Sequence, residues 1–179
     1  LSKTHDREVA HGALAHYSKR TVDIDYEFPF GKEELYGIAY RTDFDLTNHK
    51  KGSGVDISYI EEDGTKYVPH VIEPTFGVER TLLALLCEAY AEEQLEKDSR
   101  TVLRFKPHIA PVTVAVFPLV SNKEDIMKKA EEVAGLLRKD FRTAFDGIGN
   151  VGKRYRRQDE IGTPWCVTID YDTLENSTV

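Results

Sequence analysis

The stretch that decides the fold is Tyr67–Glu88, YVPHVIEPTFGVERTLLALLCE. Its first half alternates between two faces, which predicts a β-strand that ends at Glu73-Pro74. A turn at Gly77 follows, and the apolar run after it predicts a long, mostly buried helix that begins near Val78. This transition places a carboxylate beside the free amide N–H groups of a helix N-terminus, an arrangement that can hold a small charged ligand.

Arg80 lies in the first turn of the predicted helix, where a cation opposes the helix macrodipole at a cost of about 0.3–1 kcal/mol. Two explanations are open. A bound anion could favour the arginine, or Arg80 could pair with Glu79 or another nearby carboxylate.

Composition sets the broad class of the protein. The chain has 179 residues, of which 40% are hydrophobic and 31% charged, as in soluble proteins of one or two domains. The net charge of -7 carries no global signature of a nucleic-acid binder, so any RNA surface must be local. The two cysteines form no CxxC pair, and no apolar run is long enough to span a membrane. We therefore expect a cytoplasmic protein without a zinc site or a membrane partner, and the first residue, Leu1, indicates a fragment.

The residues before Tyr67 predict an antiparallel sheet. Strict alternation over Thr21–Phe30 is typical of a half-buried antiparallel strand. Around it we expect a helix over 8–20, a second strand over 35–40, a charged turn over 41–45, a flexible loop over 50–54, and a hairpin of 55–60 with 66–72.

The pattern changes after a short strand over Val102–Phe105. Two prolines in Lys106–Pro111 indicate a linker, so we expect one domain over 1–106 and a second, truncated one over 107–179. In the second, the continuous apolar run Val112–Phe117 predicts a strand buried on both faces of a parallel sheet. A capping box at Ser121–Glu124 opens a helix to Phe141, followed by a strand over 142–145, a helix over 151–160 and a strand over 165–171. This order predicts a small three-layer α/β domain.

Two motifs in the second domain suggest nucleotide chemistry, each with a plainer alternative. Gly147–Gly152 contains GxGxxG, which is either a dinucleotide fingerprint or a flexible turn; the short polar strand before it and the charged helix after it favour the turn. The helix then opens with four cations, which could bind an RNA phosphate backbone or form a solvated face: Lys153, Arg154, Arg156 and Arg157.

In the first domain, Glu34 and Glu73 could together hold a metal or an ammonium group, or could be ordinary surface charges.

Four collinear stretches resemble glycyl-tRNA synthetases of the homodimeric class II type. They are AHYSKRTVDIDYEFPF (15–30), ELYGIAYRTDFDL (34–46), VIEPTFGVER (71–80) and GKRYRRQDEIGTPWCVTI (152–169). VIEPTFGVER is similar to the third class II signature. The resemblance implies an α+β fold, in which part of an antiparallel class II catalytic sheet precedes an α/β anticodon-binding domain.

The resemblance also implies roles for residues that match the family's motifs. The ATP site comprises Glu34, Leu35, Gly77, Val78, Glu79 and Arg80. Among these, Arg80 and Glu34 are the catalytic residues, and Glu34 is the partner of ATP-bound Mg²⁺. The glycine pocket comprises Glu73, Pro74, Thr75, Phe76 and Gly77. Thr75 replaces the family's usual serine and should tighten the pocket slightly.

A carboxylate at Glu73 can receive the ammonium group of glycine, and Phe76 could form a wall that excludes larger amino acids. The implied activity is glycine–tRNA ligation with ATP, Mg²⁺ and tRNA-Gly, by a homodimer. The earlier class II signatures are not in these 179 residues, so we expect the isolated chain to form no glycyl-adenylate at a useful rate. The alternatives are a tRNA-binding module without catalysis and a dinucleotide-binding domain at Gly147–Gly152.

Overall fold

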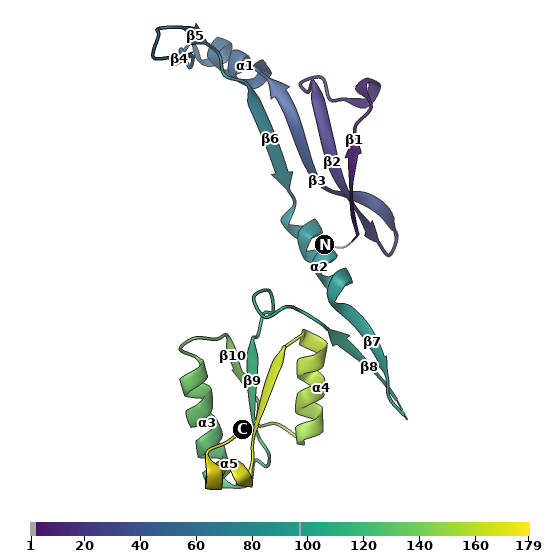
Figure 1. Ribbon diagram of the computed structural model, residues 1–179, viewed down its shortest axis with the longest axis vertical. Helices are drawn as coiled ribbons and strands as arrows, with labels where there is room; N and C mark the ends of the chain where they lie inside the picture. The colour runs from purple at the N-terminus through teal and green to yellow at the C-terminus, as the bar shows by residue number, and fades with distance from the viewer. Residues whose placement is uncertain (1–2, 97) are drawn as a thin grey trace. The chain divides into compact units, whose positions relative to one another are not determined.

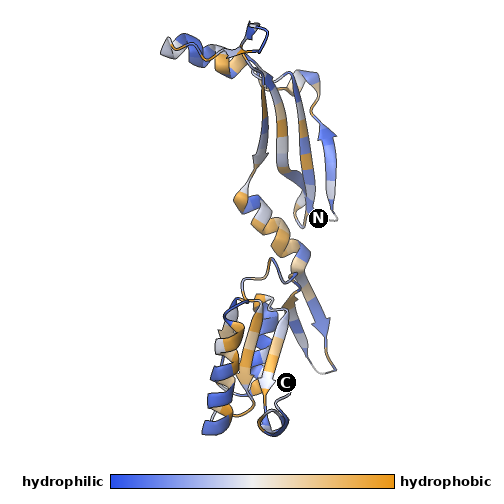
Figure 2. Cartoon of the chain, turned by 60° about the vertical axis from the view of Figure 1, so that its left-hand side comes forward, coloured by the Kyte–Doolittle hydropathy of each residue, from blue (hydrophilic) through white to orange (hydrophobic). Residues whose placement is uncertain are grey.

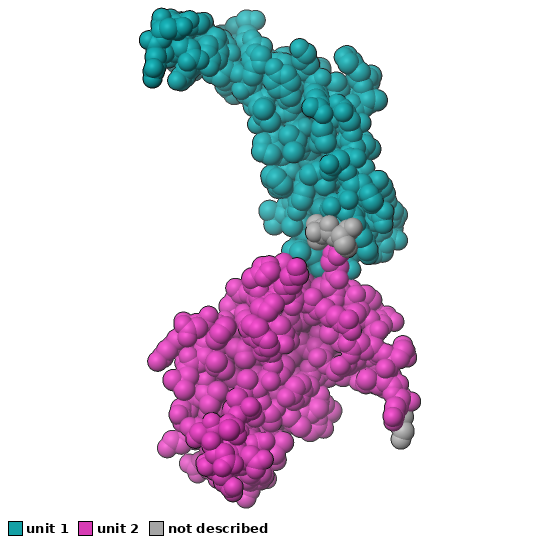
Figure 3. Space-filling model, in the orientation of Figure 1, with its two compact units in different colours: residues 1–87 teal, residues 88–179 magenta. Residues whose placement is uncertain are grey.

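The computed structural model describes residues 3–96 and 98–179. The chain divides into two compact units, 1–87 and 88–179, which Figure 3 shows in teal and magenta. None of the described helices is long and apolar enough to cross a membrane.

The first unit is built on a four-stranded antiparallel sheet in the order β1-β2-β3-β6 (Figure 1). Its strands are β1 (Thr4–Glu8), β2 (Arg20–Phe28), β3 (Gly31–Thr42) and β6 (Val71–Phe76). The predicted strand β2 is confirmed: Tyr26 and Phe28 are buried with Leu35 against Ala84 of α2 (Val78–Ala89). The predicted wet face is wrong for Asp23 and Asp25, which are buried.

The prediction of a helix over 8–20 is wrong. Residues 4–8 form strand β1, and only a short 3₁₀ turn (His11–Ala13) follows. β1 pairs antiparallel with β2, and Arg7 bonds to Asp23 and Asp25 on that neighbour. The backbone N–H groups of Val9 and Lys19 also donate to carbonyl oxygens of β2 and β3, so hydrogen bonds to the sheet at both ends of this stretch override a weak helical pattern.

Helix α1 (Phe44–Ser53) replaces the predicted turn over 41–45 and loop over 50–54. It ends at Gly54, whose φ of 70° is in the left-handed region that glycine adopts readily. The predicted hairpin is present but short, with β4 (Tyr59–Ile60) pairing with β5 (Lys66–Tyr67). β6 continues past Pro74, which the sheet tolerates because β6 is an edge strand.

Helix α2 begins at Val78 as predicted, but the prediction that it is mostly buried is wrong. Figure 2 shows hydrophobic residues along most of this helix. Val78, Leu82, Leu83 and Leu86 are exposed, while Ala84 is fully buried. The core of the first unit thus contacts only one stripe of an apolar helix.

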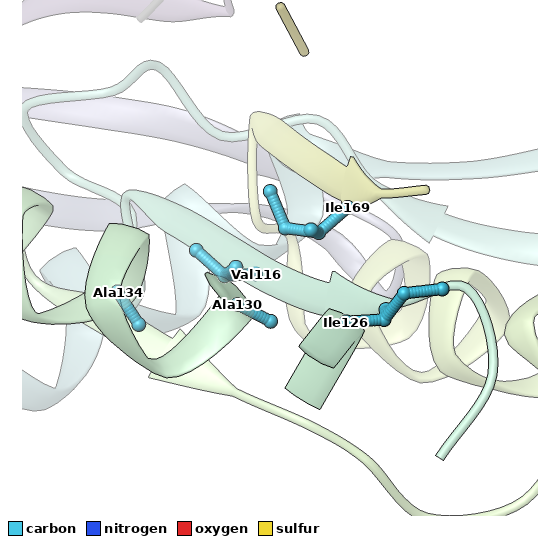
Figure 4. Packing of buried hydrophobic residues seen from close by; sticks show 5 residues of the cluster. All are labelled: Val116, Ile126, Ala130, Ala134 and Ile169. Carbon is cyan, nitrogen blue, oxygen red and sulfur yellow. The ribbon is translucent and has the colours of Figure 1, made fainter. Parts of the chain in front are cut away.

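The second unit contains the predicted three-layer α/β arrangement. Its parallel sheet has the order β10-β9-β11, from β10 (Thr143–Phe145), β9 (Val114–Pro118) and β11 (Trp165–Ile169). Helices α3 (Glu124–Leu137) and α4 (Val151–Ile161) lie on opposite sides of this sheet (Figure 1). Val116 of the fully buried strand β9 packs with Ile126, Ala130, Ala134 and Ile169, as Figure 4 shows.

Three further elements complete this unit. A hairpin of β7 (Tyr90–Gln94) and β8 (Ser99–Leu103) precedes the sheet and packs on α4, where Arg100 bonds to Asp159 at 2.8 Å. A short helix α5 (Tyr171–Asn176) follows β11. The compact units divide at Cys87/Glu88, before this hairpin, whereas the linker sequence places the domain boundary after it, at Lys106/Pro107.

The predicted capping box at Ser121 is not formed. Helix α3 begins after Lys123, which makes no side-chain capping bond. The Ser121 hydroxyl instead donates to the Gly147 carbonyl oxygen at 2.5 Å and so links the loops that follow β9 and β10.

Candidate active-site face and basic hollow

Strand register brings the predicted carboxylates to one face of the antiparallel sheet. Glu73 pairs with Ala39 and Thr75 pairs with Gly37, while Gly37 pairs on its other side with Asp23. Residues directly opposite each other on neighbouring strands share a face, so Glu73, Thr75 and Asp23 project from the same side. Gly37 and Ala39 of β3 lie between them on this face and have no bulky side chains.

These residues surround a hollow of about 300 Å³. It is lined by Val9, Ala13, Ala15, Tyr17, Thr21, Asp23, Glu34, Gly37, Ile38, Ala39, Glu73 and Thr75. Its volume is at the lower end of small-molecule sites. Its lining combines small side chains (Ala13, Ala15, Gly37 and Ala39) with three carboxylates (Asp23, Glu34 and Glu73).

Two arginines hold four carboxylates around this face. Arg41 donates to Glu73 Oε2 at 2.6 Å and to Asp45 Oδ2 at 2.6 Å. Arg7 donates to Asp23 and Asp25, each at 2.8 Å. The hydrogen bond from Arg7 lowers the pKa of Asp25, so that side chain is charged at neutral pH.

One guanidinium can balance only one of the two carboxylates that it contacts. The face therefore keeps an excess of negative charge, even though its carboxylates are held in place. An acidic hollow whose carboxylates are held in place and whose other lining residues are mostly small suits a small cationic group such as an ammonium.

Glu34 and Arg80 meet beside the hollow. Arg80 Nη1 donates to the Glu34 carbonyl oxygen at 2.6 Å and lies 3.9 Å from the Glu34 carboxylate. An ideal Cβ at Gly37 would lie 3.6 Å from Asp23 Oδ1 and 3.7 Å from Glu34 Oε1. The absence of a side chain at Gly37 thus leaves space between these two carboxylates.

The structure does not bring every predicted site residue to the hollow. Leu35 is buried in the core beside Tyr26, so only its backbone could contact a ligand. Pro74 and Phe76 alternate with Glu73 and Thr75, so they lie on the opposite face. There the Phe76 ring packs edge-on against the Tyr36 ring, with the two ring centres 4.8 Å apart.

The start of α2 holds the last predicted ATP-site residues. Val78 and Glu79 are exposed there, and an ideal Cβ at Gly77 would contact the Arg80 side chain at 3.7 Å.

Sequence reasoning missed Arg7, Arg41 and Tyr17. The Arg41 guanidinium carbon lies 3.8 Å from the centre of the Tyr17 ring, so Tyr17 is stacked next to the arginine that holds Glu73. The helical rule for residues four apart gave no signal for Arg41 and Asp45, because Arg41 is in β3 and Asp45 is in α1. No local signal joins Arg7 to β2, since that contact depends on strand pairing.

Within residues 3–96 and 98–179, no three histidine, cysteine, aspartate or glutamate side chains gather as a metal site. Glu34 still fits magnesium that arrives on phosphates, because such ions take only one or two carboxylates from the protein.

The four cations at the start of α4 do not all line the same hollow. Lys153, Arg156 and Arg157 line a hollow of about 420 Å³ with Asn150 and Gly152, which we call the basic hollow. Arg154 points away from the basic hollow and is 1% exposed.

Two of the three cations at the basic hollow already have acidic partners. Arg156 bonds to Asp98 at 2.9 Å, and Arg157 bonds to Asp146 at 2.6 Å. Burial alone would raise the pKa of Asp146, but bonds from the Ile148 N–H and from Arg157 lower it. Lys153 is exposed.

The GxGxxG segment differs from a pyrophosphate cradle. The carbonyl oxygens of Gly147, Ile148 and Gly149 accept hydrogen bonds from Arg154. A dinucleotide fingerprint instead directs backbone N–H groups at the phosphates. The structure thus agrees with a turn.

Residues 113–179 match the family model described as the anticodon binding domain. The chain is 53% identical to a glycine–tRNA ligase of Bacillus anthracis over 93% of its own length and 36% of that protein's. It is 54% identical to the glycine–tRNA ligase of Clostridium tetani over 97% of its length and 37% of that protein's. The chain thus spans a little over a third of these relatives.

The fold matches a solved class II synthetase structure, the prolyl-tRNA synthetase of Giardia lamblia in complex with prolyl-adenylate. The TM-score is 0.70 at 17% identity, and the match covers 97% of this chain and 34% of that one. This confirms the fold class, with an antiparallel synthetase sheet followed by a parallel-sheet anticodon-binding fold. The chain is thus similar, along nearly its whole length, to one part of glycine–tRNA ligases.

Proposed function

We propose that this chain is part of a glycine–tRNA ligase. Its antiparallel sheet binds the ammonium group of glycine and the phosphates of ATP, and its second unit contacts tRNA-Gly. One observation carries the proposal: strand register gathers Glu34, Glu73 and Thr75 around one acidic hollow. The similarity to glycine–tRNA ligases supports it. The whole protein would act as a homodimer.

In this proposal Glu73 receives the ammonium group of glycine. Arg41 bonds to Glu73 Oε2 and leaves Oε1 available to the substrate. Thr75 offers a hydroxyl on the same face, opposite Gly37 of β3. Since Phe76 lies on the opposite face, exclusion of larger amino acids falls to residues that line the hollow, of which Tyr17 is the largest.

Glu34 and Arg80 stand where the phosphates of ATP would bind. Arg80 offers positive charge to the nucleotide, and Glu34 offers oxygen ligands to the magnesium that accompanies it. When bound, magnesium would neutralise phosphate charge. A glycine carboxylate oxygen attacks the α-phosphorus, and pyrophosphate leaves with its bonding electrons. The side chains align the reactants and need supply no nucleophile.

The basic hollow is the proposed contact for the tRNA backbone. Three cations beside a helix N-terminus attract phosphate, and Asn150 adds a polar group at the rim. The match of residues 113–179 to the anticodon binding domain supports this placement.

A chimera tests the proposal. This chain replaces the matching part of the Bacillus anthracis glycine–tRNA ligase, and formation of glycyl-tRNA is measured. We expect charging within about tenfold of the parent, since this chain is 53% identical to the part that it replaces. A folded chimera without charging would overturn the ligase function. If the 179-residue chain still bound tRNA, the alternative of a tRNA-binding module would stand.

A further inference from the structure

A buried arginine joins the two loops at the carboxyl edge of the parallel sheet. Arg154 is on the first turn of α4, yet its guanidinium reaches back under the helix. It donates to carbonyl oxygens of Pro118, Gly147, Ile148 and Gly149 and to the Ser121 hydroxyl. Pro118 and Ser121 belong to the end of β9 and the loop after it, and the glycine segment follows β10.

These contacts explain a charge that would otherwise be costly. A cation near a helix N-terminus opposes the macrodipole, and a buried cation must have hydrogen-bond partners. The five oxygen atoms that accept from Arg154 are all uncharged, so the guanidinium is held by dipoles. The distances to Ser121 and Gly147, 2.7 and 3.0 Å, are those of well-formed bonds.

We propose that Arg154 is a positioning residue for tRNA binding, which fixes the loop over 147–150 and so sets the place of Asn150 and Lys153, and that it contacts no phosphate. This inference rests on the proposed function. Asn150 caps α4 by accepting from the Lys153 N–H at 2.9 Å, and it lines both the basic hollow and the neighbouring hollow that Arg154 borders. We call Arg154 and the five oxygen atoms that accept its hydrogen bonds the clamp. The clamp therefore adjoins Asn150, the first residue of the proposed RNA surface.

The clamp and a direct contact differ in their dependence on salt. Each phosphate contact contributes about one unit to the slope of log affinity against log salt concentration. Removal of a phosphate-binding cation thus lowers the slope, whereas a displaced loop weakens binding with the slope nearly unchanged.

The experiment measures binding of the 179-residue chain to tRNA-Gly over a salt series, for the unchanged chain, Arg154→Gln and Ser121→Ala. Ser121→Ala removes an uncharged, exposed member of the clamp, and it decides the matter if Arg154→Gln fails to fold. Arg142→Ala is the matched control, because Arg142 also donates to carbonyl oxygens, but in the linker at Pro107–Ala110.

We expect Arg154→Gln to weaken binding about tenfold or more and Ser121→Ala about threefold, both with the parent slope and with Arg142→Ala near the parent affinity. A slope reduced by about one in Arg154→Gln would assign Arg154 to a phosphate. Unchanged affinity in folded Ser121→Ala and Arg154→Gln would overturn the positioning role. If the unchanged chain binds no tRNA, both the proposed tRNA binding by the second unit and the positioning role of Arg154 are overturned.

Discussion

The guanidinium of Arg41 lies 2.6 Å from Glu73 Oε2, and this bond fixes the carboxylate to which we assign the glycine ammonium. Arg41 is itself held by Asp45 at 2.6 Å and by the ring of Tyr17. The hydrogen bond to Asp45 raises the pKa of Arg41, and the same bond lowers the pKa of Asp45, so the pair stays charged at neutral pH. A rigid support of this kind should lower the ordering cost of binding a ligand with a single cationic group.

Arg41→Ala in the chimera should raise KM for glycine about tenfold, because Glu73 loses a charge-assisted hydrogen bond. Arg41→Lys should recover part of the loss, since it keeps the charge but not the planar fork. Arg20→Ala is the matched control, because Arg20 forms an exposed pair with Glu8 on the same sheet. Equal KM values for Arg41→Ala and Arg20→Ala would contradict the support of Glu73.

Arg157→Ala should weaken tRNA binding by the 179-residue chain and lower the salt slope by about one, and Arg156→Ala should do the same. Asp98→Asn should strengthen binding, because it releases Arg156 from its ion pair. Lys129→Ala on α3 serves as a control far along the chain from the basic hollow. An unchanged slope in both arginine variants would assign these cations to solvent.

Gly162→Ala should destabilise the second unit by about 2–4 kcal/mol in urea unfolding. Gly162 has a φ of 80°, which costs other residues about 1–2 kcal/mol, and an ideal Cβ there would lie 2.7 Å from the Leu103 carbonyl oxygen and against the Phe105 ring. Gly149→Ala is the matched control, since its φ of 71° is similar but its nearest neighbour, Lys153 Cδ, is 4.0 Å away. Equal losses in both variants would contradict the close approach at Gly162.

Cys166 should make the second unit sensitive to alkaline pH. Burial raises the pKa of this thiol to about 11, whereas an unfolded cysteine titrates near about 8.5. Between these values the unfolded state loses the proton first, so the free energy of unfolding should fall as the pH rises. Cys166→Ala should remove that part of the decline, as measured by urea unfolding at pH 8 and pH 10.5. An identical decline in both proteins would contradict the burial of the thiol.

Sequence pattern predicted the elements whose burial is strongly periodic. The alternation of β2 and the continuous apolar run of β9 marked both as strands without knowledge of their neighbours. The burial of Asp23 and Asp25 could not be inferred in this way, because it depends on Arg7 of β1. β1 and α1 carry mostly polar residues, and no periodic stripe marks them. β1 exists because β2 offers a partner and Asp23 and Asp25 offer ion pairs, which only the folded sheet reveals.

The resemblance named candidate site residues but not the face of the sheet on which each side chain lies. The resemblance named Glu73 and Phe76 together, yet β6 continues through Phe76 and alternation sends the two side chains to opposite sides. Arg154 was grouped with its basic neighbours because the four cations fall within residues 153–157. Only the course of the loops shows that its guanidinium turns inward.

The central claim is that Glu73 receives the ammonium group of glycine. Its most direct test is glycine-dependent ATP–pyrophosphate exchange by the chimera carrying Glu73→Gln, with Glu62→Gln at the exposed hairpin tip as the matched control. We predict that Glu73→Gln lowers kcat/KM for glycine by about thirtyfold or more, the equivalent of a lost charged hydrogen bond of about 2 kcal/mol, while KM for ATP stays constant. A Glu73→Gln chimera that exchanges like Glu62→Gln would contradict the assignment.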